Sequence, residues 1–226
     1  MRKNLAKTKS NFSIQSFEGG YDKNCSYLLT CLETISSFIV DASLEPSRLQ
    51  PFHKSRPTAI LITHSHHDHI KYIEEYIEAY PEIKIIGHPK SKLNNISGIN
   101  YLPKGDSSMF KLGNLDIKTI HSPGHYYDSV CFLVENVIFT GDTLFIGRTG
   151  RTLSKGSNIS DLYNSVYKKL LNLSGNTVIY PGHNYGSKPT MTISENIKIS
   201  NLLQASGEKD FIDRMKNYEK TRANNS

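Results

Sequence analysis

A cluster of histidines places the strongest constraint on the fold that this chain can adopt. In LITHSHHDHI, residues 61–70, four histidines and one aspartate fall within seven positions. The cluster follows TAILIT (residues 58–63), whose apolar and β-branched side chains are typical of a strand buried on both faces. Apolar side chains then recur at helical spacing over residues 70–80, up to a proline. The histidines therefore occupy a loop between a strand and a helix.

The spacing inside the cluster suits two neighbouring metal ions. His64 and His66 are two positions apart, so in an extended segment their imidazoles point the same way and can bind one ion. Asp68 and His69 open the helix and are turned away from that pair, which suits them to a second ion. Imidazole and carboxylate are ligands for zinc, iron or manganese, and the lack of a nearby cysteine argues against a purely structural zinc site.

Three further ligand candidates lie in glycine-containing turns that follow predicted strands. His125 stands in SPGHYYDS (residues 122–129), His183 in YPGHNYGS (residues 180–187), and Asp142 in FTGD. Loops at one edge of a sheet are where α/β proteins usually build their sites. The two similar histidine turns predict equivalent ligands from two halves of a pseudo-symmetric fold, and chance similarity is the alternative.

The composition and the order of the patterns predict a single domain. With 37% hydrophobic and 21% charged residues, the chain is typical of a globular protein. No linker interrupts residues 1–226, so we expect one domain with a core at about residues 12–187 and C-terminal helices at about residues 190–220. Residues 94–104 are predicted to be irregular. No apolar run approaches the roughly 20 residues that span a bilayer.

The net charge and the cysteine pattern limit the cellular compartments and the binding partners expected for this protein. The net charge is +6, but much of it lies near the two ends, where it favours solubility and weak non-specific binding. Nucleic acid is therefore not the expected partner. Three cysteines without a C-x-x-C pair indicate a reducing compartment, and no apolar signal segment follows the basic start of the chain. We expect a cytoplasmic protein without a membrane partner.

Together these residues resemble the signature of the metallo-β-lactamase superfamily, H-x-H-x-D-H followed by a histidine, an aspartate and a histidine in separate loops. The resemblance covers about residues 12–187. It implies the α/β fold of that family, an αβ/βα four-layer sandwich of two mixed β-sheets flanked by helices. The ligands it implies are His64, His66 and His125 for the first metal, Asp68, His69 and His183 for the second, and Asp142 as a bridge. His67 has no role in this scheme.

Within the superfamily the chain is most similar to the glyoxalase II group of thioester hydrolases. The similarity rests on GGYDKNCSYLL (residues 19–29), GDTLFIGRTGR (residues 141–151) and PGHNYG (residues 181–186). It implies hydrolysis of glutathione thioesters by a hydroxide held on two divalent metal ions, with zinc as the first choice. Such binding lowers the pKa of water from about 15.7 toward 7. Asp68 would also orient the water or accept its proton.

The same resemblance predicts the substrate contacts. The substrate would be a small anionic thioester or thiol conjugate, and Arg151 and Tyr185 occupy positions that lie near the glutathione backbone in the family. Two departures bear on the substrate: Leu153 stands where the family has an aromatic residue, and GHYYDS replaces the usual Thr and Gly after the third histidine. Only about 40 residues follow PGHNYG, fewer than in the longer glyoxalase II proteins.

Other functions remain open on these residues. Persulfide dioxygenases share the fold and bind a single Fe²⁺ through two histidines and a carboxylate, which here would be His64, His125 and Asp142. A metallo-nuclease is less favoured, because the basic charge is largely terminal. A non-enzymatic binding module is disfavoured, because no ligand position is lost.

Three further polar residues have no firm assignment from the sequence. Asp41 ends a predicted strand and is either a hydrogen-bond partner of a ligand histidine or a simple turn residue. His88 and His121 are assigned no role beyond lining the site.

Overall fold

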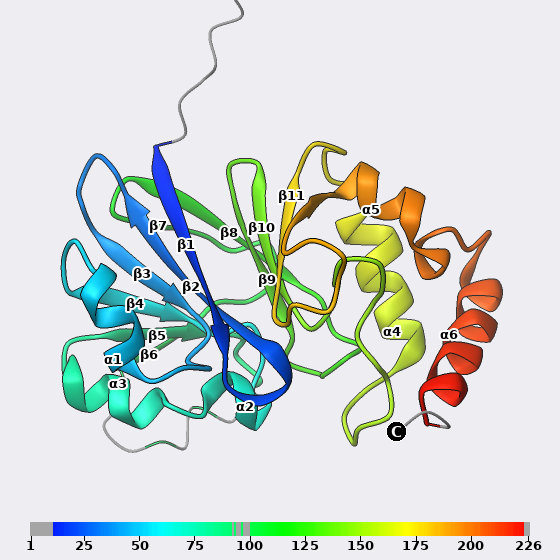
Figure 1. Ribbon diagram of the computed structural model, residues 1–226, viewed down its shortest axis with the longest axis horizontal. Coiled ribbons are helices and arrows are strands. Elements are labelled where there is room, and N and C mark those ends of the chain that lie inside the picture. Colours follow the sequence, from blue (N-terminus) through cyan, green and yellow to red (C-terminus); the bar gives the residue numbers. More distant parts are fainter. Residues whose placement is uncertain (1–10, 92, 94–95, 97–99, 224–226) are drawn as a thin grey trace, which may run out of the picture.

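Two β-sheets pack face to face and carry helices on their outer faces (Figure 1). The computed structural model describes residues 11–91, 93, 96 and 100–223. The first sheet has the order β1-β2-β3-β4-β5-β6, and both antiparallel and parallel pairs occur in it. Its strands are β1 (Phe12–Gly19), β2 (Asn24–Cys31), β3 (Ser37–Val40), β4 (Pro57–Leu61), β5 (Lys84–Gly87) and β6 (Asn100–Pro103).

The second sheet is also mixed and has the order β12-β11-β10-β9-β8-β7. Only the pairing of β10 with β11 is parallel among the pairs of this sheet in the described residues. Its strands are β7 (Met109–Leu112), β8 (Leu115–His121), β9 (Val130–Val134), β10 (Val137–Gly141), β11 (Val178–Pro181) and β12 (Met191–Thr192).

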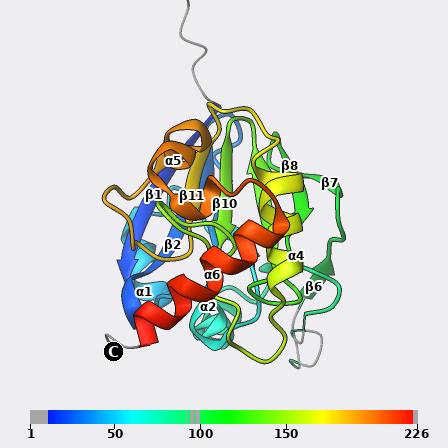
Figure 2. The ribbon, with the colours of Figure 1, turned by 90° about the vertical axis from the view of Figure 1, so that its right-hand side faces the viewer.

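Helices cover both outer faces. Those with the first sheet are α1 (Pro46–Leu49), α2 (His67–Ile70) and α3 (Ile73–Ala79), with short 3-10 turns η1 (Tyr21–Lys23) and η2 (Gln50–Phe52). Those with the second sheet are α4 (Ile159–Tyr163), its π-helical continuation η4 (Asn164–Leu170), α5 (Ile193–Ile199), η5 (Asn201–Leu203) and α6 (Glu208–Ala223). Figure 2 shows α4, α5 and α6 lying together over one side of the molecule.

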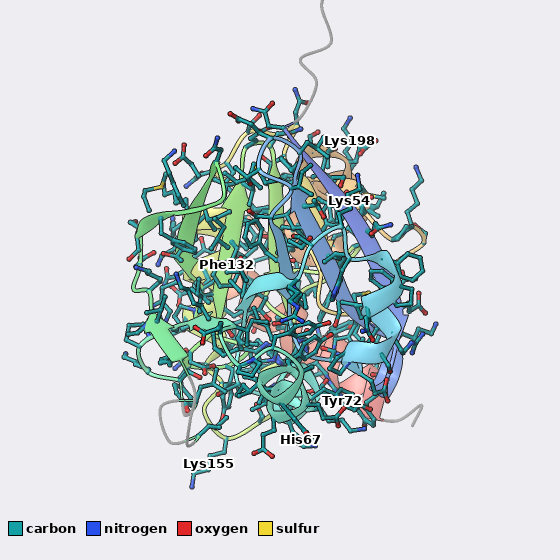
Figure 3. The ribbon with its side chains drawn as sticks, turned by 90° about the vertical axis from the view of Figure 1, so that its left-hand side faces the viewer. Lys54, His67, Tyr72, Phe132, Lys155 and Lys198 are labelled. Carbon is teal, nitrogen blue, oxygen red and sulfur yellow. The ribbon has the colours of Figure 1, made fainter. Side chains whose placement is uncertain are left out.

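Apolar side chains fill all three interfaces between these layers. Phe38 and Phe132 belong to the cluster between the two sheets, and neither exposes any surface. Phe132 is labelled among the strands in Figure 3. A second cluster joins the second sheet to α4 and α6, where Phe211 is buried, and a third joins the first sheet to α3 through Tyr76. Since helices pack on the outer face of each sheet, the expected four-layer α/β sandwich is confirmed.

Local differences from the expected elements have tertiary causes. Residues 94–104 were expected to be irregular, which is wrong for Asn100–Pro103, because this segment pairs with β5 and extends the parallel part of the first sheet. Residues 94–95 and 97–99 lie outside the described residues. The helix expected over residues 70–80 is divided after Ile70, where the N–H of Tyr72 donates to the carbonyl of Ala42. The extent of the domain over residues 1–226 stays a prediction.

No helix in the described ranges is both long enough and apolar enough to cross a bilayer.

A pair of histidines joins the two sheets at the ends of their strands. His88 follows β5, His121 ends β8, and their rings stack with centroids 3.9 Å apart and planes 11° apart. Burial, with His121 and Lys90 adding to it, lowers the pKa of His88 to about 4. Because neither ring lines the main cleft described below, the expectation that they line the site is not supported.

Replacing His88 should reduce the pH dependence of stability. In the unfolded chain its pKa is near 6.5, so between about pH 6.5 and 4 the unfolded state binds a proton that the folded state does not. The free energy of unfolding should be highest above this pH range and lower by about 2 kcal/mol at about pH 5. We expect His88→Asn to lack this loss in urea unfolding at about pH 7.5 and 5. An unchanged loss, or an equal effect of the exposed-site control His67→Asn, would contradict it.

Candidate metal centre and its cleft

The ligand candidates come from loops of both sheets that meet at one edge of the sandwich. The loop after β4 carries residues 64–69, and α2 lies at this edge between the two halves (Figure 1). The loops after β8, β10 and β11 carry His125, Asp142 and His183. The N–H of Cys25 donates to the carbonyl of Gly182 at 2.8 Å, which joins the first sheet to the last of these loops.

Three imidazoles converge on the first half of the site. His64 Nε2 and His125 Nε2 each lie 3.0 Å from His66 Nδ1. The three nitrogens fall within 4.8 Å of one another, which is the spacing expected around a common ion. The structure therefore brings together the three residues that the sequence assigned to the first metal.

The second half contains a carboxylate and two imidazoles. His183 Nε2 lies 3.4 Å from Asp68 Oδ2, and His69 Nε2 lies 3.7 Å from the same oxygen. These three residues again form a set whose donor atoms lie within 4.8 Å of one another.

Asp142 lies between the two halves. Its Oδ1 is 3.3 Å from His69 Nε2, while its Oδ2 is 3.4 Å from His183 Nε2 and 3.5 Å from His125 Nε2. Asp142 also forms a third set with one histidine from each half, His64 and His69. This position is the one that a bridging carboxylate requires.

Hydrogen bonds on the far side of the rings set which nitrogen faces the site. His125 Nδ1 lies 2.9 Å from the carbonyl of Arg151, and His183 Nδ1 lies 2.8 Å from the carbonyl of Asp22. A carbonyl only accepts, so in each ring Nδ1 carries the proton and donates it. In the neutral form of each ring, Nε2 therefore turns a lone pair toward the site, as a metal ligand must.

Asp41 performs the same task for His69 and also shapes the loop. Its carboxylate accepts hydrogen bonds from the N–H and the hydroxyl of Thr63, both at 2.8 Å, and from His69 Nδ1 at 2.8 Å. Asp41 is buried and adopts a φ of 58° at the end of β3. Of the two roles that the sequence left open, the structure gives Asp41 the hydrogen bond to a candidate ligand.

Two glycines are required where the loops come closest. A Cβ at Gly182 would lie 2.3 Å from Asp142 Oδ1 and 2.8 Å from His69 Cε1, so any side chain there would displace the site. Gly124 has a φ of +137°, and a Cβ there would lie 2.3 Å from the backbone of Leu162 in α4. The Pro-Gly-His pattern therefore follows from close approach at both turns.

Burial and neighbouring charges act differently on the imidazoles and the carboxylate. Burial, with His125 adding to it, lowers the pKa of His66 to about 4. Burial also opposes the charged form of His183, but Asp142 and Asp68 together outweigh it and raise the pKa of His183 to about 9. Burial would raise the pKa of the Asp142 carboxyl, yet His69 and His183 hold it well below its usual value. His66 is thus neutral near pH 7 and Asp142 is ionised.

The donor atoms fit divalent metal ions. His69 Nε2 and Asp142 Oδ1 are buried, and neither forms a hydrogen bond of good geometry within the described residues. His66 Nδ1 lies 3.0 Å from two other ring nitrogens, His64 Nε2 and His125 Nε2. If one of these three nitrogens carries a proton, its N–H can donate to only one of the other two, so at least one lone pair has no partner. A cation satisfies them together, and a set of imidazoles and carboxylates without thiolate suits zinc, iron or manganese.

A cleft opens over these donors. It has a volume of about 360 Å³, and both residues predicted to contact substrate, Arg151 and Tyr185, line it. Tyr21 and Leu153 form its rim, with 74% and 65% of their surfaces exposed. His67 points away from the cleft and is exposed at the edge of the molecule in Figure 3.

The sequence matches one family over most of this fold. The family model for the metallo-beta-lactamase superfamily matches residues 26–183, which include all seven ligand candidates. The chain belongs to the metallo-beta-lactamase superfamily. The sequence resemblance to this superfamily is therefore confirmed, while the metal-binding role of each residue stays a prediction.

Two relatives and one solved structure are similar to this chain. The protein "Probable hydroxyacylglutathione hydrolase glo2" of Schizosaccharomyces pombe is 33% identical over 214 residues, covering 89% of this chain and 77% of that protein. "Probable polyketide biosynthesis zinc-dependent hydrolase BaeB" of Bacillus velezensis is 26% identical, covering 84% and 86%. The crystal structure of ETHE1 from Myxococcus xanthus shares the fold, with a TM-score of 0.79, 23% identity and 91% of each chain covered.

Sequence reasoning missed the contributions of two N-terminal residues and misplaced one pair of loops. Asn24 Nδ2 donates to Asp68 Oδ2 at 3.2 Å, and the carbonyl of Asp22 orients His183. A polar residue at the start of an apolar strand was the only signal for Asn24. The turns that hold His125 and His183 were expected from two halves of the fold, which is wrong, because both extend from the second sheet.

Removing the charge of Asp41 should weaken metal binding. Asp41→Asn loses the carboxylate that orients His69, and such outer partners typically contribute 10–100-fold to metal affinity. We expect a weakening of that order for zinc, measured by competition with a chromogenic chelator. The matched control is Asp116→Asn, an exposed carboxylate paired with Lys111. Equal affinity in the two variants would show that Asp41 does not support the site.

The metal content of alanine variants should distinguish His67 from the ligand candidates. We expect His67→Ala to retain the metal of the wild type, because its exposed ring lies outside the donor sets. His64→Ala and Asp142→Ala should each lower the metal content, measured by elemental analysis of protein purified without added metal. An equal loss in all three variants would show that the cluster is misassigned.

Proposed function

We propose that the site binds two divalent metal ions and that the protein is a thioester hydrolase of the hydroxyacylglutathione hydrolase type. His64, His66 and His125 would hold one ion, Asp68, His69 and His183 the other, and Asp142 would bridge them. The observation that carries this proposal is the pair of complete donor sets on either side of one carboxylate. Zinc is the first choice of metal, as in the zinc-dependent relative.

Bound metal ions would polarise the thioester carbonyl and lower the pKa of water in the cleft. The reaction consumes one water and one thioester and yields a carboxylic acid and a thiol. This reaction is supported by the relatives named as hydroxyacylglutathione hydrolases, which are 31–36% identical to this chain over the matched residues.

Asp68 is the proposed catalytic residue. Its carboxylate lines the cleft and keeps part of its surface exposed. Although burial opposes ionisation, hydrogen bonds from His183 and Asn24 help to lower the pKa of the Asp68 carboxyl. An ionised carboxylate at this position can orient the attacking water and accept its proton, in addition to binding metal.

The substrate would lie along the wall formed by Arg151 and Tyr185. The Tyr185 hydroxyl donates to the carboxylate of Asp22 at 2.5 Å, and its ring stacks on His183 with planes 4° apart. These contacts fix the tyrosine beside the metal donors. A small anionic glutathione thioester would place its carbonyl over the donors and its peptide portion against this wall.

The single-iron dioxygenase is a weaker candidate for this chain. It would use His64, His125 and Asp142 and would leave Asp68, His69 and His183 as a complete donor set without an ion. Outer hydrogen bonds hold the imidazoles of this second set as firmly as those of the first. These donors are compatible with two ions, and the hydrolase is favoured over the dioxygenase by the relatives named as hydroxyacylglutathione hydrolases.

An assay with metal analysis tests the proposal. We expect purified protein to contain about two equivalents of divalent metal per chain and to release thiol from S-D-lactoylglutathione, measured with a thiol reagent. Asp68→Asn should lower kcat by at least about 100-fold, since it removes the proposed general base and also a candidate metal ligand. One iron per chain, with uptake of O₂ on addition of glutathione persulfide and no thioester hydrolysis, would overturn it.

A further inference from the structure

A second arginine, Arg148, is held beside the cleft by aromatic residues. Its guanidinium lies over the ring of Tyr185, 3.9 Å from the centroid, and donates a hydrogen bond to the hydroxyl of Tyr218 at 3.0 Å. Tyr185 in turn stacks on His183, with centroids 4.9 Å apart. Imidazole, phenol and guanidinium thus form one column that starts at the candidate metal site.

Arg148 and Arg151 line the same small hollow next to the cleft. Within the described residues, neither guanidinium forms an ion pair with a carboxylate. Asp142 also lines the hollow, but its oxygens face the imidazoles of the metal site. Two guanidinium groups without a carboxylate partner make this hollow favourable for an oxyanion, which arginine binds through paired N–H donors.

Helix α6 holds the loop that carries both arginines. Glu219 accepts hydrogen bonds from the N–H of Thr152 at 2.6 Å and from its hydroxyl at 3.1 Å. Tyr218, one residue earlier, accepts from Arg148. The C-terminal end of α6 lies at the same lower edge as α2 in Figures 1 and 2. The position of the two arginines therefore depends on this helix as well as on their own loop.

We propose that Arg148 and Arg151 form a subsite for an anionic group, a carboxylate or a phosphate, carried by the thiol portion of the thioester, and that Tyr218 positions Arg148. This inference rests on the proposed hydrolase function. Thiol carriers of acyl groups bear such groups, as carboxylates in glutathione and as phosphates in coenzyme A, whereas the acyl group varies. The subsite makes Arg148 a specificity-determining residue, because it selects a charged thiol carrier over an uncharged one.

Three substrates with one acyl group test the subsite. S-D-lactoylglutathione supplies carboxylates, D-lactoyl-coenzyme A supplies phosphates, and S-D-lactoyl-N-acetylcysteamine has no anionic group. For each protein, the measured quantity is the ratio of kcat/KM for a charged thioester to kcat/KM for the uncharged one. We expect Arg148→Met to lower this ratio 10–100-fold, the range typical of a lost charged hydrogen bond. The charged substrate whose ratio falls identifies the anion.

Matched variants separate this effect from general damage. Arg56→Met removes an arginine from a different surface hollow and should leave the ratio unchanged. Arg148→Lys, which retains the charge but not the paired donors, should lower the ratio less than Arg148→Met. Circular dichroism and thermal unfolding report whether each variant is folded, and Arg148→Lys carries the test if Arg148→Met is not.

The role of Tyr218 is tested by combining variants. Tyr218→Phe should lower the ratio severalfold in the wild type and should have no further effect in Arg148→Met, because it acts through that arginine. An equal effect in both backgrounds would overturn the positioning role.

The two proposals fail in different ways. If the wild type hydrolyses none of the three thioesters, the hydrolase function itself is overturned. If it hydrolyses them but Arg148→Met and Arg148→Lys leave the ratio unchanged, only the anion subsite is overturned.

Discussion

The structure depends on the convergence of nitrogen and oxygen lone pairs at one edge of two sheets. Burying such lone pairs without a partner costs free energy. The arrangement therefore persists only if a bound ion, or strong local restraints on the side chains, offset this cost. Asp41 supplies one restraint, since a single carboxylate holds both Thr63 and His69. The carbonyls of Asp22 and Arg151 supply others by orienting His183 and His125. These groups come from both sheets, so the site forms only when the sandwich closes.

The candidate metal donors and the two arginines of the proposed anion subsite lie on different segments of the chain. The candidate metal donors stand on short loops directly after strands, where the sheets restrict their movement. Arg151 and Arg148, two of the candidate substrate contacts, stand on the segment 148–153, which α6 holds from outside through Tyr218 and Glu219. Changes in α6 could therefore alter which substrate is accepted without disturbing the donors. Such a division is common where one fold supports many activities.

Much of the fold was predictable because local patterns and tertiary packing agree. The apolar strand β4 and the histidine cluster that follows it were recognisable from residue type and spacing alone. The strand β6 was missed because its pairing with β5 is a long-range interaction that has no local signal. The break after Ile70 was missed for the same reason, since the carbonyl of Ala42 lies far away in the sequence. Second partners such as Asn24 are likewise visible only once the sheets are paired.

The sequence by itself determined the superfamily, the α/β sandwich and the set of seven donor candidates, because their residue types and order are local properties of the chain. Tertiary structure alone decided that Asp142 lies between the two groups of donor candidates, within 3.3–3.5 Å of His69, His125 and His183. It also decided that both Pro-Gly-His turns leave one sheet and that Arg148 lies beside Tyr185. These are distances between residues far apart in the chain, and they are set by how the sheets and α6 pack.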